Sequence, residues 1–329
     1  MIDSTKKHEK LFLFAPVFLC RLRAFAGKFS AQSFVITCLL VCAFLFTSCK
    51  NQTSADTPIT VQTREITDDA GRRVSIPEKI ERAVSLAPNL TEIAFAVDAG
   101  DRLVGVTTFC NYPVETQKIQ KIGDTQTPNI ENIIALKPQI VLVSTASQME
   151  NFSKTLEQQG IKVFVTNPNS LDDIYKTIYQ FGEIFGKDEK AQQVVNELKK
   201  RVLEVDAKTD SAKNAKVFLQ ISREPLFTVG KDSFMTDLIS RAGGESVTTN
   251  IEKDYPNLSK ETALALNPEA IILSDSEDNR EPNDVFKNSP AVRNGKVFKI
   301  NADLISRPAP RIVDALEQIA KALHPENFE

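Results

Sequence analysis

The sequence predicts an α/β protein built from two similar lobes, each a parallel sheet covered by helices, with one long helix joining them. Three observations carry this prediction. Short apolar runs of strand length alternate with helical stretches, which is the pattern of parallel sheets covered on both faces. The alternation occurs twice, before and after a long amphipathic helix, and a segment of the first half recurs in the second.

The first lobe is expected over residues 64–186. Residues 64–77 predict a hairpin that turns at Asp69-Ala70-Gly71. Buried parallel strands are predicted at residues 83–86, 103–106, 140–143 and 163–165. A helix is predicted from Ser170, whose hydroxyl suits a helix N-cap, to Phe185, because Gly186 breaks the pattern.

The connecting helix is expected over residues 187–208, because its apolar residues fall on one side: Val194, Val195, Leu198, Val202 and Val205. The second lobe is then expected over residues 209–329. It repeats the strand pattern at residues 217–221, 226–229, 270–273 and 297–300. A last helix is predicted from Arg311 to Leu323.

An internal repeat with an offset of 130 residues relates the two halves. The offset aligns Glu131 with Glu261, and Ile134-Ala135-Leu136-Lys137-Pro138 with Leu264-Ala265-Leu266-Asn267-Pro268, and each copy then runs into an apolar strand. Each unit reads as a short helix stopped by proline and followed by a buried strand. The halves therefore look like duplicated lobes, and a ligand cleft is expected between them, near the strand carboxyl ends.

Residues 1–48 differ from the rest of the chain. A basic segment precedes an uncharged apolar run, Phe34 to Phe46, and small residues then lead to Cys49, as in a secretory signal. The pattern resembles a bacterial lipobox, in which Cys49 is acylated and becomes the new first residue. Residues 49–63 would then tether an exported protein to the membrane, facing the periplasm or cell exterior. The alternative is an uncleaved signal anchor, with Cys49 an ordinary thiol.

Composition excludes several classes of function. Forty Lys and Arg against 43 Asp and Glu argue against a nucleic-acid-binding protein. The two histidines, His8 and His324, cannot build a multi-histidine metal site, and His324 lies too near the end for a Ser-His-Asp arrangement, so no enzyme activity, metal or cofactor is expected. Beyond Cys49 only Cys110 remains, so no internal disulfide is expected; an inert buried thiol is favoured for Cys110 over a contact with a bound metal.

Several stretches resemble one known family. They are Val84-Ser85-Leu86-Ala87-Pro88-Asn89-Leu90-Thr91-Glu92, Asn111-Tyr112-Pro113, Phe227-Thr228-Val229-Gly230-Lys231, Ala242-Gly243-Gly244-Glu245 and Arg307-Pro308-Ala309-Pro310-Arg311. The chain resembles the helical-backbone solute-binding proteins of bacterial ABC importers, which take up cobalamin, ferric siderophores and haem, and within them most closely the cobalamin receptors. The resemblance covers nearly all of residues 80–323.

The resemblance implies the partners of the protein. In the family, one surface acid per lobe docks on arginines of the two permease subunits, and Glu131 and Glu261 match those positions. A twofold permease needs one equivalent contact per lobe, which agrees with the repeat. The alternative is that both are first-turn acids that favour their helices through the dipole. The expected partners are an ABC permease dimer and its ATPase, and the receptor is expected to be a monomer.

The resemblance also implies ligand-binding residues. Phe109 and Tyr112 match a cleft loop of the first lobe, and Tyr255 matches an aromatic of the second. Arg307 matches an arginine that meets ligand oxygens, and Arg223, after the strand ending at residue 221, is a further candidate. Packing within their own turns is the alternative for Phe109 and Tyr112, and surface ion pairs are the alternative for the arginines. Tyr175 and Tyr179, one helical turn apart, indicate helix packing.

The expected ligand is cobalamin or a related corrinoid, because a broad, mostly apolar ring fringed with amides suits aromatic faces and a few polar groups. The chain has no Trp, and Thr125 stands where cobalamin receptors place one. The alternatives are therefore a ferric siderophore or haem receptor on the same scaffold, and, in a different class, a surface interaction lipoprotein without a small ligand.

Overall fold

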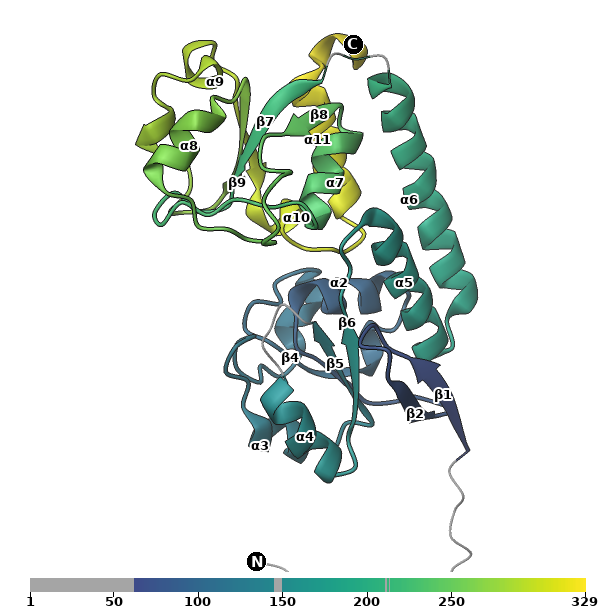
Figure 1. Ribbon diagram of the computed structural model, residues 1–329. Coiled ribbons are helices and arrows are strands. Elements are labelled where there is room, and N and C mark those ends of the chain that lie inside the picture. The colour runs from purple at the N-terminus through teal and green to yellow at the C-terminus, as the bar shows by residue number, and fades with distance from the viewer. Residues whose placement is uncertain (1–61, 145–149, 211, 213) are drawn as a thin grey trace, which may run out of the picture. The chain divides into compact units, whose positions relative to one another are not determined.

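The computed structural model describes residues 62–144, 150–210, 212 and 214–329. Residues Val61–Glu329 form one compact unit, shown in Figure 1. The predicted signal peptide, the lipidation site Cys49 and nearly all of the tether lie outside the described residues. Among the described residues no helix combines the length and the apolar character needed to cross a membrane.

The N-terminal lobe contains a four-stranded parallel sheet. Its strands are β3 (Ala83–Ser85), β4 (Leu103–Val106), β5 (Ile140–Ser144) and β6 (Lys162–Thr166). Their order across the sheet is β4-β3-β5-β6. Alternating side chains bury on opposite faces. Val141 and Val143 pack toward α3 (Ile130–Ala135) and α4 (Glu150–Gln158), whereas Ile140 and Leu142 pack toward α2 (Pro88–Ala96) and α5 (Leu171–Phe185).

The C-terminal lobe repeats this plan. Its strands are β7 (Ala215–Gln220), β8 (Gly244–Ser246), β9 (Ala270–Asp275) and β10 (Val297–Asn301), in the order β10-β9-β7-β8. Numbered within each lobe, both sheets have the order 2-1-3-4. One face packs on α8 (Lys260–Leu266) and α9 (Pro290–Arg293), and the other on α7 (Phe234–Arg241) and α11 (Ile312–Leu323). The duplication expected from the sequence repeat is therefore present in the topology.

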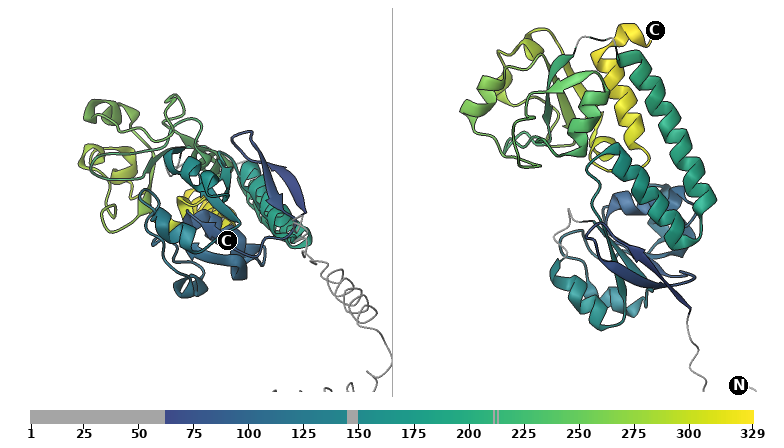
Figure 2. Two further views of the ribbon diagram at one scale, coloured as in Figure 1. Left: turned by 90° about the horizontal axis from the view of Figure 1, so that it is seen from below. Right: turned by 45° about the vertical axis from the view of Figure 1, so that its right-hand side comes forward.

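A helical pair joins the lobes. α5 begins at Ser170, whose hydroxyl accepts a hydrogen bond from the Asp173 backbone N–H, and ends at Gly186 with φ 64°. α6 (Asp188–Thr209) then runs back along α5 and onto α7 and α11 of the other lobe, as Figures 1 and 2 show. Arg201 on α6 pairs with Asp314 and Glu317 on α11 at 2.7 and 2.8 Å. One buried apolar cluster extends from both sheets through these helices.

The predicted N-terminal hairpin is present as β1 (Thr63–Thr67) and β2 (Arg73–Pro77), which pair antiparallel. Its turn is fastened to β6 and to the loop that follows. Asp69 N–H donates to the Val165 carbonyl at 3.0 Å, and the Asp69 carboxylate accepts from the Asn167 backbone N–H at 2.7 Å. Lys176 on α5 donates to the same carboxylate at 2.8 Å. The turn of the hairpin therefore holds β6 and the loop that follows it in place.

One strand prediction for the second lobe was wrong, and one strand was missed. Residues 226–229 form no strand; Phe227 makes only isolated bridges to Ser222 and Asn257. The apolar side chains of this segment are buried within a loop, and a short apolar run in a buried loop has the same sequence pattern as a buried strand. The sheet instead gains β8, a three-residue strand Gly-Glu-Ser that carries no apolar signal. In the part of the chain that the structure describes, the remaining short helices are α10 (Ala302–Ile305) and the 3₁₀ helices Gly100–Arg102, Val114–Lys118, Asp284–Phe286 and Pro325–Asn327.

Candidate functional site

A cleft of about 690 Å³ is lined by residues of both lobes. The N-terminal lobe contributes Ala87, Pro88, Asn89, Phe109, Thr125, Ser144, Asn167, Pro168 and Asn169. The C-terminal lobe contributes Ser233, Phe234, Asp254, Tyr255, Asp303, Ser306, Arg307 and Pro308. The cleft has the volume of a small-molecule site and combines aromatic with polar side chains.

The N-terminal wall is built where parallel strands end. Ala87 to Asn89 follow β3, Phe109 follows β4, Ser144 ends β5, and Asn167 to Asn169 follow β6. Crevices at the carboxyl ends of such strands are where open α/β sheets bind ligands. Phe109 exposes 56% of its surface, so its ring is available to a ligand and is not packed beneath its own turn.

The C-terminal wall holds Tyr255 on a loop that pairs with the segment after β7. Thr228 N–H donates to the Pro256 carbonyl at 3.1 Å, and Gly230 N–H donates to the Asp254 carbonyl at 2.8 Å. A side chain at Gly230 would collide with the Lys253 carbonyl, so glycine permits this close approach. The Tyr255 hydroxyl hydrogen-bonds Ser233, and burial of that end raises the pKa of Tyr255. The residue as a whole stays 41% exposed.

Glu92 on α2 connects the two lobes. Its carboxylate is 2% exposed and accepts hydrogen bonds from Arg311 Nε at 2.8 Å and Nη2 at 2.6 Å. Arg307 Nη1 donates to the same carboxylate at 3.0 Å. Both arginines belong to the C-terminal lobe, so a bidentate and a single charge-assisted contact cross between the lobes.

Arg307 is occupied by protein partners on both of its terminal nitrogens. Besides Glu92, Nη1 donates to Asn111 Oδ1 at 2.8 Å, and Nη2 donates to Asp303 Oδ1 at 2.6 Å and to the Phe109 carbonyl at 3.4 Å. Its side chain is 10% exposed. The predicted arginine therefore lies in the cleft wall, where it positions the Phe109 loop against the other lobe.

Two predicted residues lie off the cleft lining. The Tyr112 ring stacks under the Arg311 guanidinium, whose carbon lies 3.8 Å from the ring centroid, and so extends the contact between the lobes. Arg223 pairs with Asp284 at 3.0 Å, and its carbonyl accepts from Asn283. The structure does not bring Arg223 to the cleft, because the chain after β7 turns toward the 3₁₀ turn Asp284–Phe286 instead.

Glu131 and Glu261 occupy matching places in the two lobes. Both are exposed first-turn residues, of α3 and α8, and each helix is capped by the side chain two residues earlier, Asn129 or Ser259. A hydrogen bond from its own backbone N–H and one from Ser259 lower the pKa of Glu261. Neither glutamate forms an ion pair with a described residue, so both carboxylates are available to a partner.

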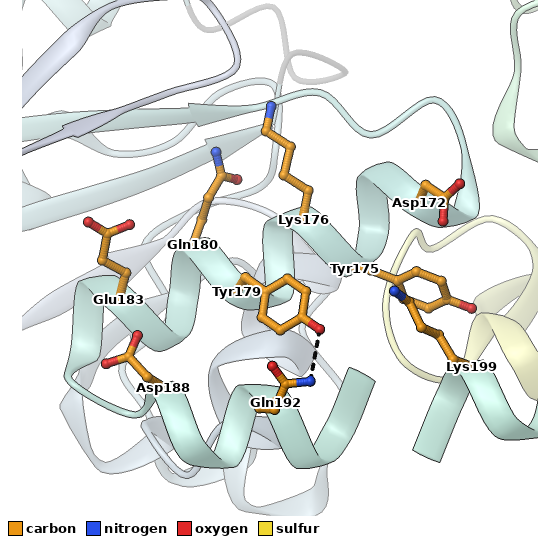
Figure 3. A pocket seen from close by; sticks show the side chains of 9 residues that line it. All are labelled: Asp172, Tyr175, Lys176, Tyr179, Gln180, Glu183, Asp188, Gln192 and Lys199. Atoms are coloured by element: carbon orange, nitrogen blue, oxygen red, sulfur yellow. Dashed lines mark hydrogen bonds between the residues drawn. The ribbon is translucent and has the colours of Figure 1, made fainter. Parts of the chain in front are cut away.

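A second hollow, of about 550 Å³, lies between α5 and α6. Figure 3 shows Tyr179 and Gln192 bonded across the two helices, and Lys199 beside Tyr175. Tyr175 is buried, as helix packing predicts. Lys176 and Gln180 turn away to the hairpin residue Asp69. The hydrogen bond between Tyr179 and Gln192 in this hollow thus holds α5 and α6 together.

Cys110 is buried next to Phe109. Its Sγ lies 3.2 Å from the hydroxyl oxygens of Thr91 and Thr107, and the residue is 2% exposed. The expected burial of this thiol is confirmed, and Cys110 is not among the residues that line the cleft.

Among the residues of this region that sequence reasoning missed are Asn89, Glu92 and Asp254. Asn89 and Glu92 lie within the stretch that carried the resemblance, and the strand-end rule applied to β3 points to Asn89. Glu92 is recognisable only through its partners more than 200 residues away. Asp254 precedes Tyr255 in a loop without a local pattern.

Two α/β lobes of one topology with a polar and aromatic cleft between them define a solute-binding protein. Comparison with known proteins agrees. A family model described as "periplasmic binding protein" matches residues 84–304, and the chain belongs to this family, as the sequence led us to expect. A substrate-binding lipoprotein of an ABC transporter from Bacillus subtilis is 32% identical over 305 residues, 88% of this chain and 96% of its own length.

Two further related proteins align with this chain over most of their own length. A vitamin B12-binding protein from Vibrio parahaemolyticus is 31% identical over 256 residues, 77% of this chain and 90% of its own. The crystal structure of the periplasmic vitamin B12-binding protein of Vibrio cholerae superposes with a TM-score of 0.67 at 28% identity, covering 77% of this chain and 100% of that one. The two-lobed α/β fold predicted from the sequence is therefore confirmed.

Proposed function

We propose that this protein is the substrate-binding lipoprotein of an ABC importer and that it captures cobalamin or a related corrinoid. The observation that carries the proposal is the cleft, in which Phe109 of one lobe and Tyr255 of the other expose their rings to the same space of about 690 Å³. Flat aromatic faces around a site of this size suit a broad ring. Relatives named as vitamin B12-binding proteins support the choice.

Delivery would use the two exposed glutamates. Glu131 and Glu261 stand on equivalent helices of lobes with equal topology, so a twofold permease meets one carboxylate from each lobe. Arginines on the permease would pair with them through two parallel hydrogen bonds. Transport energy would come from the partner ATPase, and acylated Cys49 would hold the receptor at the membrane, as a lipoprotein among its relatives suggests.

Calorimetric titration of residues 50–329 with cyanocobalamin tests this function, with haem and a ferric siderophore titrated beside it. This chain contains the whole compact unit. We expect a dissociation constant below about 1 μM for cyanocobalamin, which corresponds to ~8 kcal/mol. Phe109→Ala and Tyr255→Ala should each weaken binding by about tenfold, since each removes one ring face. Leu203→Ala is the matched control, because Leu203 is an exposed apolar residue of α6 away from the cleft.

The outcomes separate the readings. Tight siderophore or haem binding without cobalamin binding would keep the receptor role and change the ligand. Failure of all three ligands to bind a folded protein would contradict the receptor role and favour a surface interaction lipoprotein.

A further inference from the structure

The charged groups at the cleft nearly cancel one another. Glu92 and Asp303 offset Arg307 and Arg311 through the contacts described above, at 2.6 to 3.0 Å. Asp254 is different: it lines the cleft, is exposed, and forms no ion pair with any described residue. The C-terminal wall therefore offers a ligand an uncompensated carboxylate, which only accepts hydrogen bonds.

The N-terminal wall has the opposite character. α2 starts at the cleft with no side-chain cap and no acidic residue in its first turn, so the positive end of its dipole faces the site unopposed. Asn89 lies in that first turn and lines the cleft, and only 5% of its surface is exposed. Its amide nitrogen has no hydrogen-bond partner among the described residues. The nitrogen itself is buried, and rotation about the soft terminal torsion would bring it to a ligand oxygen in the cleft.

We propose that the cleft recognises primary amide groups at the ligand's rim and discriminates against carboxylates, with Asn89 donating to amide carbonyls and Asp254 accepting from amide N–H groups. The inference rests on the proposed function and names the chemistry by which the same cleft selects its ligand. A primary amide satisfies both walls because it carries an acceptor and two donors. A carboxylate satisfies Asn89 but meets Asp254 as a like charge, and an ester offers nothing to Asp254.

Dicyano corrinoids that differ only in their side chains, as primary amides, methyl esters or free acids, test the inference on residues 50–329. We expect the amide form to bind about tenfold more tightly than the ester, since one hydrogen bond to a charged acceptor is lost. The acid form should bind at least tenfold more weakly again. Acid binding equal to or tighter than amide binding would overturn the inference while leaving a corrinoid receptor in place.

Two variants test the contributions of the two walls of the cleft separately. Asn89→Ala should weaken the amide and the ester forms equally, by about tenfold, because both carry the carbonyl that Asn89 meets. Asp254→Asn should weaken the amide form, leave the ester unchanged, and recover part of the acid binding. Asn196→Ala, an exposed asparagine on α6, is the control. Melting temperatures should stay unchanged, and equal losses for amide and ester in Asp254→Asn would contradict the assignment.

A cobalamin-negative result is also informative. If haem binds instead, the corrinoid proposal fails, and haem is then compared with its dimethyl ester. Tighter binding of the free acid would overturn charge selection by Asp254, whereas tighter binding of the ester would retain that half of the inference. If no ligand binds, both proposals are wrong.

Discussion

At the scale of single residues, Tyr175 stands out because its hydroxyl is buried without a hydrogen-bond partner among the described residues. The side chain lies between α5 and α6, with Lys199 Nζ 5.3 Å from its ring centroid. Burial raises the pKa of Tyr175 to about 12. The neutral phenol is thus preferred in the folded protein, because burial disfavours the phenolate more than the charge of Arg241 favours it.

This pKa makes stability depend on pH in the alkaline range. The unfolded chain ionises Tyr175 near pH 10, before the folded chain does, so its stabilisation is complete below pH 10 and is lost as the pH rises toward 12. We expect Tyr175→Phe to match the parent within ~0.5 kcal/mol at pH 8 and to be more stable by ~1 kcal/mol at pH 11. Urea unfolding at both values measures this. A difference that does not change with pH would contradict it.

At the scale of elements, α3 and α8 are the repeated unit of the molecule. The Asn129 side chain accepts from the Asn132 backbone N–H at 2.9 Å, and the Ser259 hydroxyl accepts from the Thr262 backbone N–H at 3.1 Å. Each helix is followed by a proline and then by a strand that is buried over at least its first five residues. The two glutamates are thereby presented on rigid, equivalent supports rather than on loops.

Removing both carboxylates should separate docking from ligand capture. For Glu131→Ala with Glu261→Ala we expect ligand affinity to stay within twofold, since both lie outside the cleft. Receptor-stimulated ATP hydrolysis by the cognate transporter in liposomes should fall by tenfold or more, because two arginine–carboxylate contacts are lost. Glu197→Ala with Glu204→Ala on α6 removes the same charge elsewhere. Loss of ligand binding in the first pair, or equal loss of stimulation in the second, would refute the docking role.

At the scale of the whole molecule, the lobes are joined at two separate places. The first is the helical connection, where α6 packs on both lobes. The second is Glu92, which receives Arg307 and Arg311 from the other lobe. Removing a buried carboxylate that pairs with two arginines strongly destabilises a protein, because the two cations are left without their partner.

Glu92→Ala should therefore lower the free energy of unfolding by ~3 kcal/mol. Asp284→Ala, which breaks the exposed pair with Arg223, should cost less than ~1 kcal/mol. Urea denaturation compares the two, and a broadened or two-step transition in Glu92→Ala would show that the lobes unfold independently. Equal costs for the two variants would show that Glu92 does not couple the lobes.

Much of the fold could be predicted because apolar strands and capped helices carry local signals. Ser170, Gly186 and the repeat that contains Pro138 and Pro268 mark their elements directly. β8 could not be predicted, since three residues of Gly-Glu-Ser pair through their backbone alone. The loop at residues 226–229 misled for the opposite reason, because its apolar side chains are buried without a ladder.

The candidate site divides in the same way. Phe109, Tyr255 and Arg307 were predicted by resemblance, and the structure lines the cleft with all three. The engagement of Arg307 by Glu92, Asn111 and Asp303 could not be predicted, because the contact forms only when separate lobes meet. The placement of Asn89 opposite Asp254 likewise could not be predicted, because the two residues come together only when the two lobes form opposite walls of one cleft.

The burial of Cys110 has a practical consequence for spectroscopy. It is the only cysteine beyond position 49, and its sulfur is shielded between Thr91 and Thr107. A soluble chain that begins at Lys50 therefore offers thiol reagents almost no background. Cysteines introduced at exposed positions of the two lobes, such as Val114 and Leu264, would take up fluorophores selectively. A distance between the two lobes can therefore be measured by fluorescence without first removing a native cysteine.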